Sequence, residues 1–298
     1  MVSRRFLVCA LSLLALSQQL HAQLKVDLKL PRRLYMAYEP IMASIAITNF
    51  SGRDITLENN EGQNWLNFEV TNADGTLLPP RAGKSQFEPR RLAAGESCNF
   101  AVNLVTSYPV TEFGSYRIRA SIYFAPMSKF FSSPLRNIEV SEGKVIWEQT
   151  LGVPEGQPDV GNQRQVSLLS FRNADENDLY VRIEDKDAGV IYETQKVGRL
   201  IAQGLPQIEV DPRNTLHLMQ IVSPKTYLYS RIGLNGEQIL HGTYYETKTR
   251  PKLARMANGD VGIAGGQAGG APATAQETEA TAAARPKISD RPAELPKE

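Results

Sequence analysis

The clearest alternation of hydrophobic and polar positions lies in Phe113–Phe124, which reads FGSYRIRASIYF. Apolar side chains occupy every second position from Tyr116 to Phe124, and arginine, serine or tyrosine fills the positions between them. A period of two is typical of a β-strand with one buried face. We therefore predict a central strand that follows a turn at Gly114. Tyr116 is placed as a tyrosine corner, with a packed ring and a hydroxyl bonded to upstream backbone.

The N-terminal half contains further short segments with the same alternation, separated by turn residues. They are Leu24–Leu30, Ile41–Ile47, Ile55–Leu57, Leu66–Val70, Cys98–Leu104 and Ile138–Val140. About seven short strands with regularly spaced turn signals are expected for an immunoglobulin-like β-sandwich. We predict this sandwich over residues 23–150, with residues 79–97 as its longest irregular loop.

Four short motifs follow one another within residues 24–147. They are Tyr38–Ile41, Ile47–Gly52, Leu92–Ser97 and Phe113–Tyr116. In this order they resemble bacterial secreted immunoglobulin-like domains, including the type related to the BsuPI proteinase inhibitor and to macroglobulin-like modules. These are scaffold motifs, so the resemblance implies a fold and no active site. The Arg- and Pro-rich loop at residues 79–97 does not match the inhibitor pattern, so the resemblance assigns no inhibitory residue in this chain.

The C-terminal half begins after residues 151–162, whose Gly, Pro, Asp and Asn content is typical of a linker. Seven short strands are predicted over residues 163–264. They are Val166–Phe171, Leu179–Ile183, Gly189–Thr194, Gln207–Val210, Leu216–Ile221, Tyr227–Ile232 and Gln238–Tyr245. The sequence LYVRI at Leu179–Ile183 returns as LYSRI at Leu228–Ile232, and each unit ends in a hairpin.

A repeat of roughly 45 residues with four short strands is the period of a propeller blade. Two units are fewer than a closed propeller needs. The C-terminal half is therefore a small open β-sheet domain, a fragment that closes by self-association, or a chance recurrence of hairpins.

The two ends of the chain have compositions of their own. Residues 1–22 join Arg4 and Arg5 to the apolar run Phe6–Leu16 and end in Leu-His-Ala, as a secretory signal peptide does. Export by the twin-arginine route is less favoured, because no residue separates the arginines from the apolar run. We expect an exported protein of the periplasm, cell envelope or extracellular space, without a membrane span after signal removal. Residues 265–298 are rich in Ala, Gly, Pro, Thr and Glu and are predicted to be disordered.

The overall charge argues against one class of partner. The chain has 33 basic and 32 acidic residues, a formal charge of +1. This balance lacks the basic surplus typical of nucleic-acid binders.

Cysteine and histidine are too few to suggest chemistry. Cys9 leaves with the signal peptide, so the mature chain keeps one thiol, Cys98, and no internal disulfide. Cys98 lies on the apolar face of its strand and is predicted to be a small buried side chain, the alternatives being a nucleophile or an intermolecular disulfide. His217 and His241 are far apart in the sequence, and their positions match neither a zinc-binding nor a haem-binding motif. We predict no metal, no cofactor and no catalytic residue, with His217 at the surface or on a pocket rim.

One acidic segment partly resembles a calcium loop. Asp185, Asp187 and Gly189 have the spacing of its first positions, but the remaining ligands are missing. A solvated hairpin turn is the favoured interpretation.

Six residues are candidates for binding a partner. They are Arg81, Arg90, Arg91, Trp65, Tyr227 and Tyr229. The arginines surround the 79–97 loop and could bind an acidic partner, or they could simply be solvated. The aromatic residues could bind protein or glycan if exposed, or pack between the domains; Trp65 is predicted to point outward.

The sequence therefore predicts an all-β, exported, non-enzymatic protein that binds a protein or glycan, or serves a structural role. The alternative is an accessory or inhibitory module of an extracellular hydrolase or protease system. In that case residues 79–97 are the candidate inhibitory loop.

Overall fold

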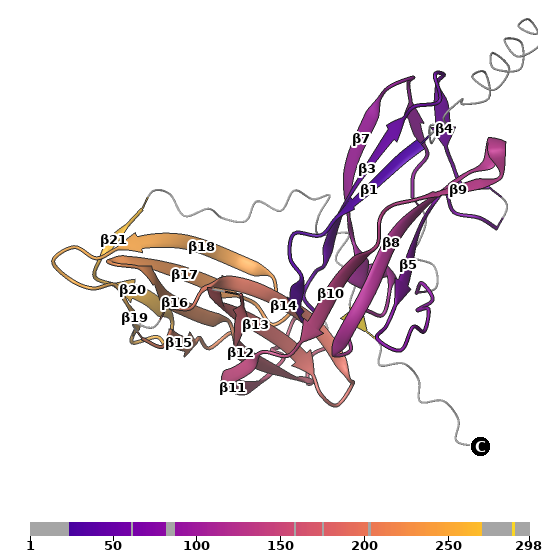
Figure 1. The fold of residues 1–298 in the computed structure, drawn as a ribbon. Coiled ribbons are helices and arrows are strands. Elements are labelled where there is room, and N and C mark those ends of the chain that lie inside the picture. The colour runs from indigo at the N-terminus through magenta and orange to yellow at the C-terminus, as the bar shows by residue number, and fades with distance from the viewer. Residues whose placement is uncertain are drawn as a thin grey trace, which may run out of the picture.

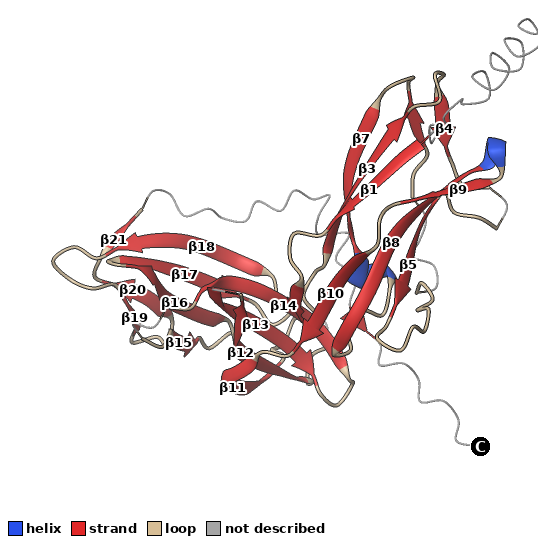
Figure 2. Ribbon diagram, in the orientation of Figure 1, coloured by secondary structure: helices blue, strands red, loops and turns tan. Residues whose placement is uncertain are grey.

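The computed structural model describes residues 24–60, 62–81, 87–157, 159–174, 176–201 and 204–269, and the backbone of Ile288–Ser289. Figure 2 shows that almost all regular structure in these residues is strand. The predicted signal peptide and most of the predicted disordered tail lie outside the described residues. Two helical turns are described, α2 (Leu104–Ser107) and η1 (Ala125–Met127). In the described part of the chain, no helix is long and apolar enough to cross a membrane.

The N-terminal half is a β-sandwich, on the right in Figure 1. One sheet contains β1 (Leu24–Lys29), β3 (Met42–Asn49) and β7 (Ser97–Asn103), in that order. The other has the order β2 (Leu34–Met36), β10 (Arg136–Ser141), β8 (Gly114–Phe124) and β5 (Leu66–Thr71), and β9 (Lys129–Ser132) also pairs with β8. The short strands β4 (Ile55–Leu57) and β6 (Arg90–Leu92) pair with each other. A single hydrophobic core draws on both sheets.

The predicted central strand is confirmed as β8, which lies between β10 and β5. Every second side chain from Tyr116 to Phe124 is buried, as the alternation requires. The Tyr116 hydroxyl donates a hydrogen bond of 2.8 Å to the backbone oxygen of Glu112, which confirms the tyrosine corner. Gly114 has a φ of +138°, a region that side chains disfavour, so the turn needs glycine.

The loop predicted over residues 79–97 is less irregular than expected. It contains β6, and its residues 82–86 lie outside the described part. Arg90 and Arg91 therefore lie on a strand that pairs with β4. The three-residue strands β2 and β6 were missed because their exposure does not alternate, whereas that of the equally short β4 does.

The C-terminal half contains two antiparallel sheets and a hairpin, and all seven predicted strands are confirmed. The first sheet has the order β11 (Lys144–Gly152), β12 (Gln163–Asn173), β13 (Glu176–Asp185), β14 (Val190–Arg199) and β22 (Ile288–Ser289). The second has the order β15 (Gln207–Val210), β16 (Leu216–Ser223), β17 (Thr226–Ile232), β18 (Gln238–Tyr245) and β21 (Gln267–Ala268). The hairpin is β19 (Lys252–Arg255) with β20 (Val261–Ala264).

Two boundaries differ from the sequence prediction. Strand β11 pairs with β12 from Lys144 to Gly152, so most of residues 151–162 connects two strands of one sheet. The chain instead leaves the sandwich at Glu142–Gly143. A Cβ at Gly143 would lie 2.9 Å from the Met36 sulfur, which shows how closely the two halves approach. Ordered pairing also continues past residue 265, where disorder was predicted to begin, because β21 pairs with β18 and β22 with β14.

The sandwich, the two sheets and the hairpin stack in series outward along the molecule (Figure 1). On β13, Leu179, Val181 and Ile183 face the second sheet, whereas Tyr180 packs against Met36 of the sandwich. The far face of the second sheet, with Met219, Tyr227 and Tyr229, is covered by Leu253 and Ile263 of the hairpin. The hairpin thus covers the face of the second sheet on which a further sheet could stack. The predicted closure of this half by self-association stays a prediction.

Candidate functional site

A cleft forms where the chain passes from one sheet of the sandwich to the other. Strand β1 pairs with β3 as far as Lys29. Pro31 then follows, which has no N–H to donate, and the chain crosses to begin β2 at Leu34. Because β2 pairs with β10 only from Glu139 onward, the start of β10 lacks a neighbour on that side. The gap is a cleft of about 540 Å³ between residues 29–33 and 135–137.

A second cleft of about 530 Å³ adjoins the first over the ends of β2, β8 and β10. Arg33 and Asn137 line both, so the two clefts are neighbours. We call the two together the basic cleft and define it by residues 29–34, 72–73, 115–117 and 135–139. Each of the two clefts is within the size range of ordinary ligand sites.

Positive charge dominates the lining of the basic cleft. Lys29, Arg33, Arg117 and Arg136 are exposed there, against the single exposed carboxylate of Glu139. Within the described residues, no ion pair is recorded for Lys29, Arg33 or Arg117. Since the whole chain carries a formal charge of only +1, this charge is a local feature that attracts anions.

Arg32 forms the floor of the cleft and is held by a buried carboxylate. Its guanidinium lies 2.8 Å from Glu39 Oε2 and donates to the Tyr180 hydroxyl at 3.1 Å. Tyr180 donates in turn to Glu39 Oε2 at 2.8 Å, and the Met36 amide donates to Oε1 at 2.7 Å. Burial is the largest single influence and opposes the charge of Arg32, but the hydrogen bonds and charge interactions with Glu39 and Tyr180 together raise the arginine's pKa above its usual range. Tyr180 keeps its proton because burial and Glu39 raise its pKa.

A second arginine also ties the two halves together. Arg182 on β13 donates to the backbone oxygen of Ala37 at 2.9 Å and lies 2.9 Å from the Glu142 carboxylate. Together with Glu39 and Tyr180, it fixes the sandwich against the first C-terminal sheet. The floor of the basic cleft is thus rigidly supported.

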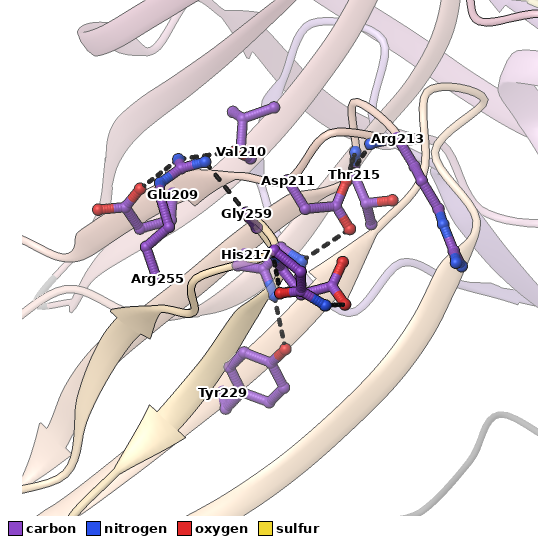
Figure 3. A network of polar contacts seen from close by, with 11 residues as sticks. Glu209, Val210, Asp211, Arg213, Thr215, His217, Tyr229, Arg255 and Gly259 are labelled. Carbon is purple, nitrogen blue, oxygen red and sulfur yellow. Dashed lines mark hydrogen bonds and ion pairs between the residues drawn. The ribbon is translucent and has the colours of Figure 1, made fainter.

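A buried histidine lies in the second sheet (Figure 3). His217 on β16 is 2% exposed, with Nδ1 2.8 Å from the Tyr229 hydroxyl and Nε2 3.2 Å from Asp211 Oδ2. A carboxylate can only accept, so Nε2 carries the proton and Tyr229 donates to Nδ1. Asp211 also accepts from the amides of Arg213 and Thr215, which fixes the turn before β16.

The expectation that His217 lies at the surface is wrong, because the hairpin β19–β20 covers its face of the sheet. Arg255 of the hairpin pairs with Glu209 at 2.7 Å and donates to the Val210 oxygen (Figure 3). Burial lowers the pKa of His217 and raises that of Tyr229 to about 12. An Asp-His-hydroxyl series is the order of a catalytic triad. Here, however, the hydroxyl belongs to a buried tyrosine, so the network acts as a structural brace.

Stability is expected to fall as the pH drops below about 6.5, the pKa of an unperturbed histidine. The lowered pKa of His217 means that the unfolded chain takes up a proton before the folded one does. His241, whose pKa is also lowered by burial, acts in the same direction. Urea unfolding at several pH values should show this loss, and His217→Gln should reduce its slope. An unchanged slope in the variant would contradict the neutral, buried assignment of His217.

A third cleft, of about 300 Å³, borders this network and includes Trp147, Asn214 and Arg255. Several of its polar groups are already engaged, since Arg255 pairs with Glu209 and the Asn214 amide donates to the Gly152 oxygen at 2.7 Å. The basic cleft is therefore the better candidate site.

The predicted binding arginines do not form one surface. Arg91 makes an exposed ion pair of 3.1 Å with Asp54, and the Arg90 guanidinium lies 4.7 Å from the centre of the Phe100 ring. The backbone N–H of Arg81 donates to the Ser107 oxygen at 2.7 Å. A binding role for these arginines stays a prediction.

The predicted binding aromatics are buried. Trp65 is 0% exposed, packs edge-on against Phe87 and Phe100, and donates from Nε1 to the Phe87 oxygen. Its predicted outward orientation is wrong, because it precedes β5 and these phenylalanines cover it. Tyr227 and Tyr229 lie beneath the hairpin and so pack within the C-terminal half, not between the two halves.

Cys98 is half-buried against the sandwich core, close to the predicted apolar position. Burial raises the pKa of its thiol, which disfavours the reactive thiolate.

The predicted solvated hairpin turn is confirmed at residues 186–189, which are exposed between β13 and β14, but Asp185 itself is not solvated. Asp185 is buried and accepts hydrogen bonds of 3.0 Å from the fully buried Arg164 and 2.9 Å from the Ala188 amide. The described residues contain no group of three or more His, Cys, Asp or Glu side chains that could hold a metal ion.

The chain matches no protein-family model and no curated protein sequence. Among solved structures it is similar to the crystal structure of Spo0M, a sporulation control protein from Bacillus subtilis. The TM-score is 0.26 and the identity 11%, over 60% of this chain and 90% of that one. Similarity at this level assigns neither a fold family nor a function.

Proposed function

We propose that the protein is an exported, non-enzymatic binding protein that takes an anionic partner, a protein or a glycan, in the cell envelope or extracellular space. The observation that carries this proposal is the basic cleft. It gathers Lys29, Arg33, Arg117 and Arg136 on a chain of almost balanced charge. Cations without carboxylate partners retain their capacity for charge-assisted hydrogen bonds.

We also infer that the sandwich is immunoglobulin-like. The strand orders β1-β3-β7 and β2-β10-β8-β5, with β2 parallel to β10, support this assignment, as does the tyrosine corner on β8. Such sandwiches are scaffolds on which binding sites of many kinds occur, so the proposed function rests on the cleft.

The proposal is tested by titrating the mature protein with polyglutamate, polygalacturonate and neutral dextran. At least one polyanion is expected to bind, and dextran is not. The affinity should fall steeply when ionic strength rises from about 50 mM to about 500 mM, because the cleft is exposed and salt screens its charges. Equal binding of dextran, or no binding of either polyanion, would contradict the proposal.

A further inference from the structure

We propose that the basic cleft binds an acidic peptide in an extended conformation, which pairs as an added strand with the open edge of β10. This inference rests on the proposed function and specifies its ligand.

The first observation is the direction of the β10 backbone. The Glu139 amide donates to the Arg33 oxygen at 2.7 Å, so the backbone groups of Glu139 face β2. Groups two residues apart along a strand point to the same side. The N–H and C=O of Asn137 therefore face the same way, where β2 has ended and the cleft begins. A donor and an acceptor at a strand edge are a template for an incoming strand.

The second observation is the wall opposite this edge. It is formed by Leu30 and Pro31, and Pro31 has no N–H with which to pair. Leu135 extends the β10 side and is 47% exposed. The chain thus leaves the edge open and lines the space with apolar contacts on both sides.

The third observation is charge. Lys29 and Arg33 belong to the segment opposite the open edge, and Arg136 belongs to β10, from which its Nε reaches across to donate to the Leu28 oxygen at 2.9 Å. An extended peptide rises about 3.3 Å per residue and directs alternate side chains to the same face, so carboxylates at every second position can reach these cations together. Tyr116 is the one aromatic residue in the described lining of the cleft, and its ring is buried. A peptide is therefore favoured over a glycan, which would gain from an exposed aromatic surface.

The test uses three probes at low salt. One is an acetylated and amidated peptide of about eight residues that alternates Glu and Val, long enough to span the cleft. The second is the same peptide with every amide N-methylated, which keeps its charge and removes its main-chain donors. The third is polygalacturonate, an anionic glycan.

Two variants test the protein side of the pairing. Asn137→Pro removes the Asn137 N–H, which faces the cleft, without removing a bond to β8, and proline is tolerated at strand edges. Asn137→Ala keeps that N–H and is its matched control. Thermal unfolding confirms that both variants remain folded.

We expect the peptide to bind, and N-methylation and Asn137→Pro each to weaken binding at least tenfold, with Asn137→Ala close to the unmodified protein. Equal binding of the two peptides would overturn strand pairing and leave the anion-binding proposal intact. Binding of polygalacturonate alone would do the same. If no anionic probe binds, both proposals fail.

Discussion

Reversing two charges in the basic cleft, Arg33→Glu together with Arg117→Glu, is expected to weaken binding of polyglutamate by at least about a hundredfold. A hydrogen bond to a charged group contributes about 1.5–3 kcal/mol, and about 1.4 kcal/mol is a factor of ten. Both side chains are exposed and have no recorded ion pair among the described residues, so the fold should be unaffected. Titration of each protein with polyglutamate measures the effect.

The matched control reverses two cations elsewhere, Arg53→Glu with Lys248→Glu. Arg53 is exposed in the turn after β3 and Lys248 in the turn after β18, so the net charge changes equally and the cleft is untouched. Its binding should stay within about threefold of the unmodified protein, since distant exposed charges are screened. Equal losses in the two double variants would show that attraction to the whole molecule, not to the cleft, explains binding.

The replacement Glu39→Gln is expected to destabilise the protein by about 3 kcal/mol, because removing one partner of a buried ion pair leaves an uncompensated charge. The carboxylate is 3% exposed and accepts from Arg32, Tyr180 and the Met36 amide. An amide can present only one oxygen to these donors, so at least one N–H of the protein would face the NH₂ group. Urea unfolding measures the change.

Tyr180→Phe is the milder comparison. It removes one donor to Glu39 and leaves the ion pair with Arg32 in place, so a loss of about 1 kcal/mol is expected. If Glu39→Gln were as stable as the unmodified protein, Glu39 would not be the residue that holds the two halves together.

Sequence periodicity predicted those strands that bury one face. Strand β8 is the clearest case, and the tyrosine corner at Tyr116 followed from its position. Strand β13 was found by its apolar content, but its stacking could not be predicted, since Tyr180 and Arg182 face the sandwich while Leu179 faces the next sheet. When both faces of a strand are buried, the sequence no longer alternates between apolar and polar residues. It then does not show which face packs against which neighbour.

The errors in single side chains have a common cause. Trp65 and His217 were assigned to the surface from the alternation of their own segments, but residues distant in sequence cover both. Local alternation separates the two faces of a strand and does not say what lies above each face.

The basic cleft was not predicted, because it arises from tertiary structure. It exists where the chain changes sheets at Pro31 and leaves the first residues of β10 without a neighbour. The only local signals were the run Pro31-Arg32-Arg33 and the arginine at position 117 on the polar face of the central strand. Neither indicated that Arg33, Arg117 and Arg136 line two neighbouring clefts.

The most direct test of the proposed site is amide hydrogen exchange of the mature protein with and without saturating polyglutamate. The basic cleft predicts slower exchange within residues 29–34, 72–73, 115–117 and 135–139, with little change elsewhere. Slower exchange confined to the Arg90–Leu92 strand or to the C-terminal sheets would contradict this assignment and place the binding surface there.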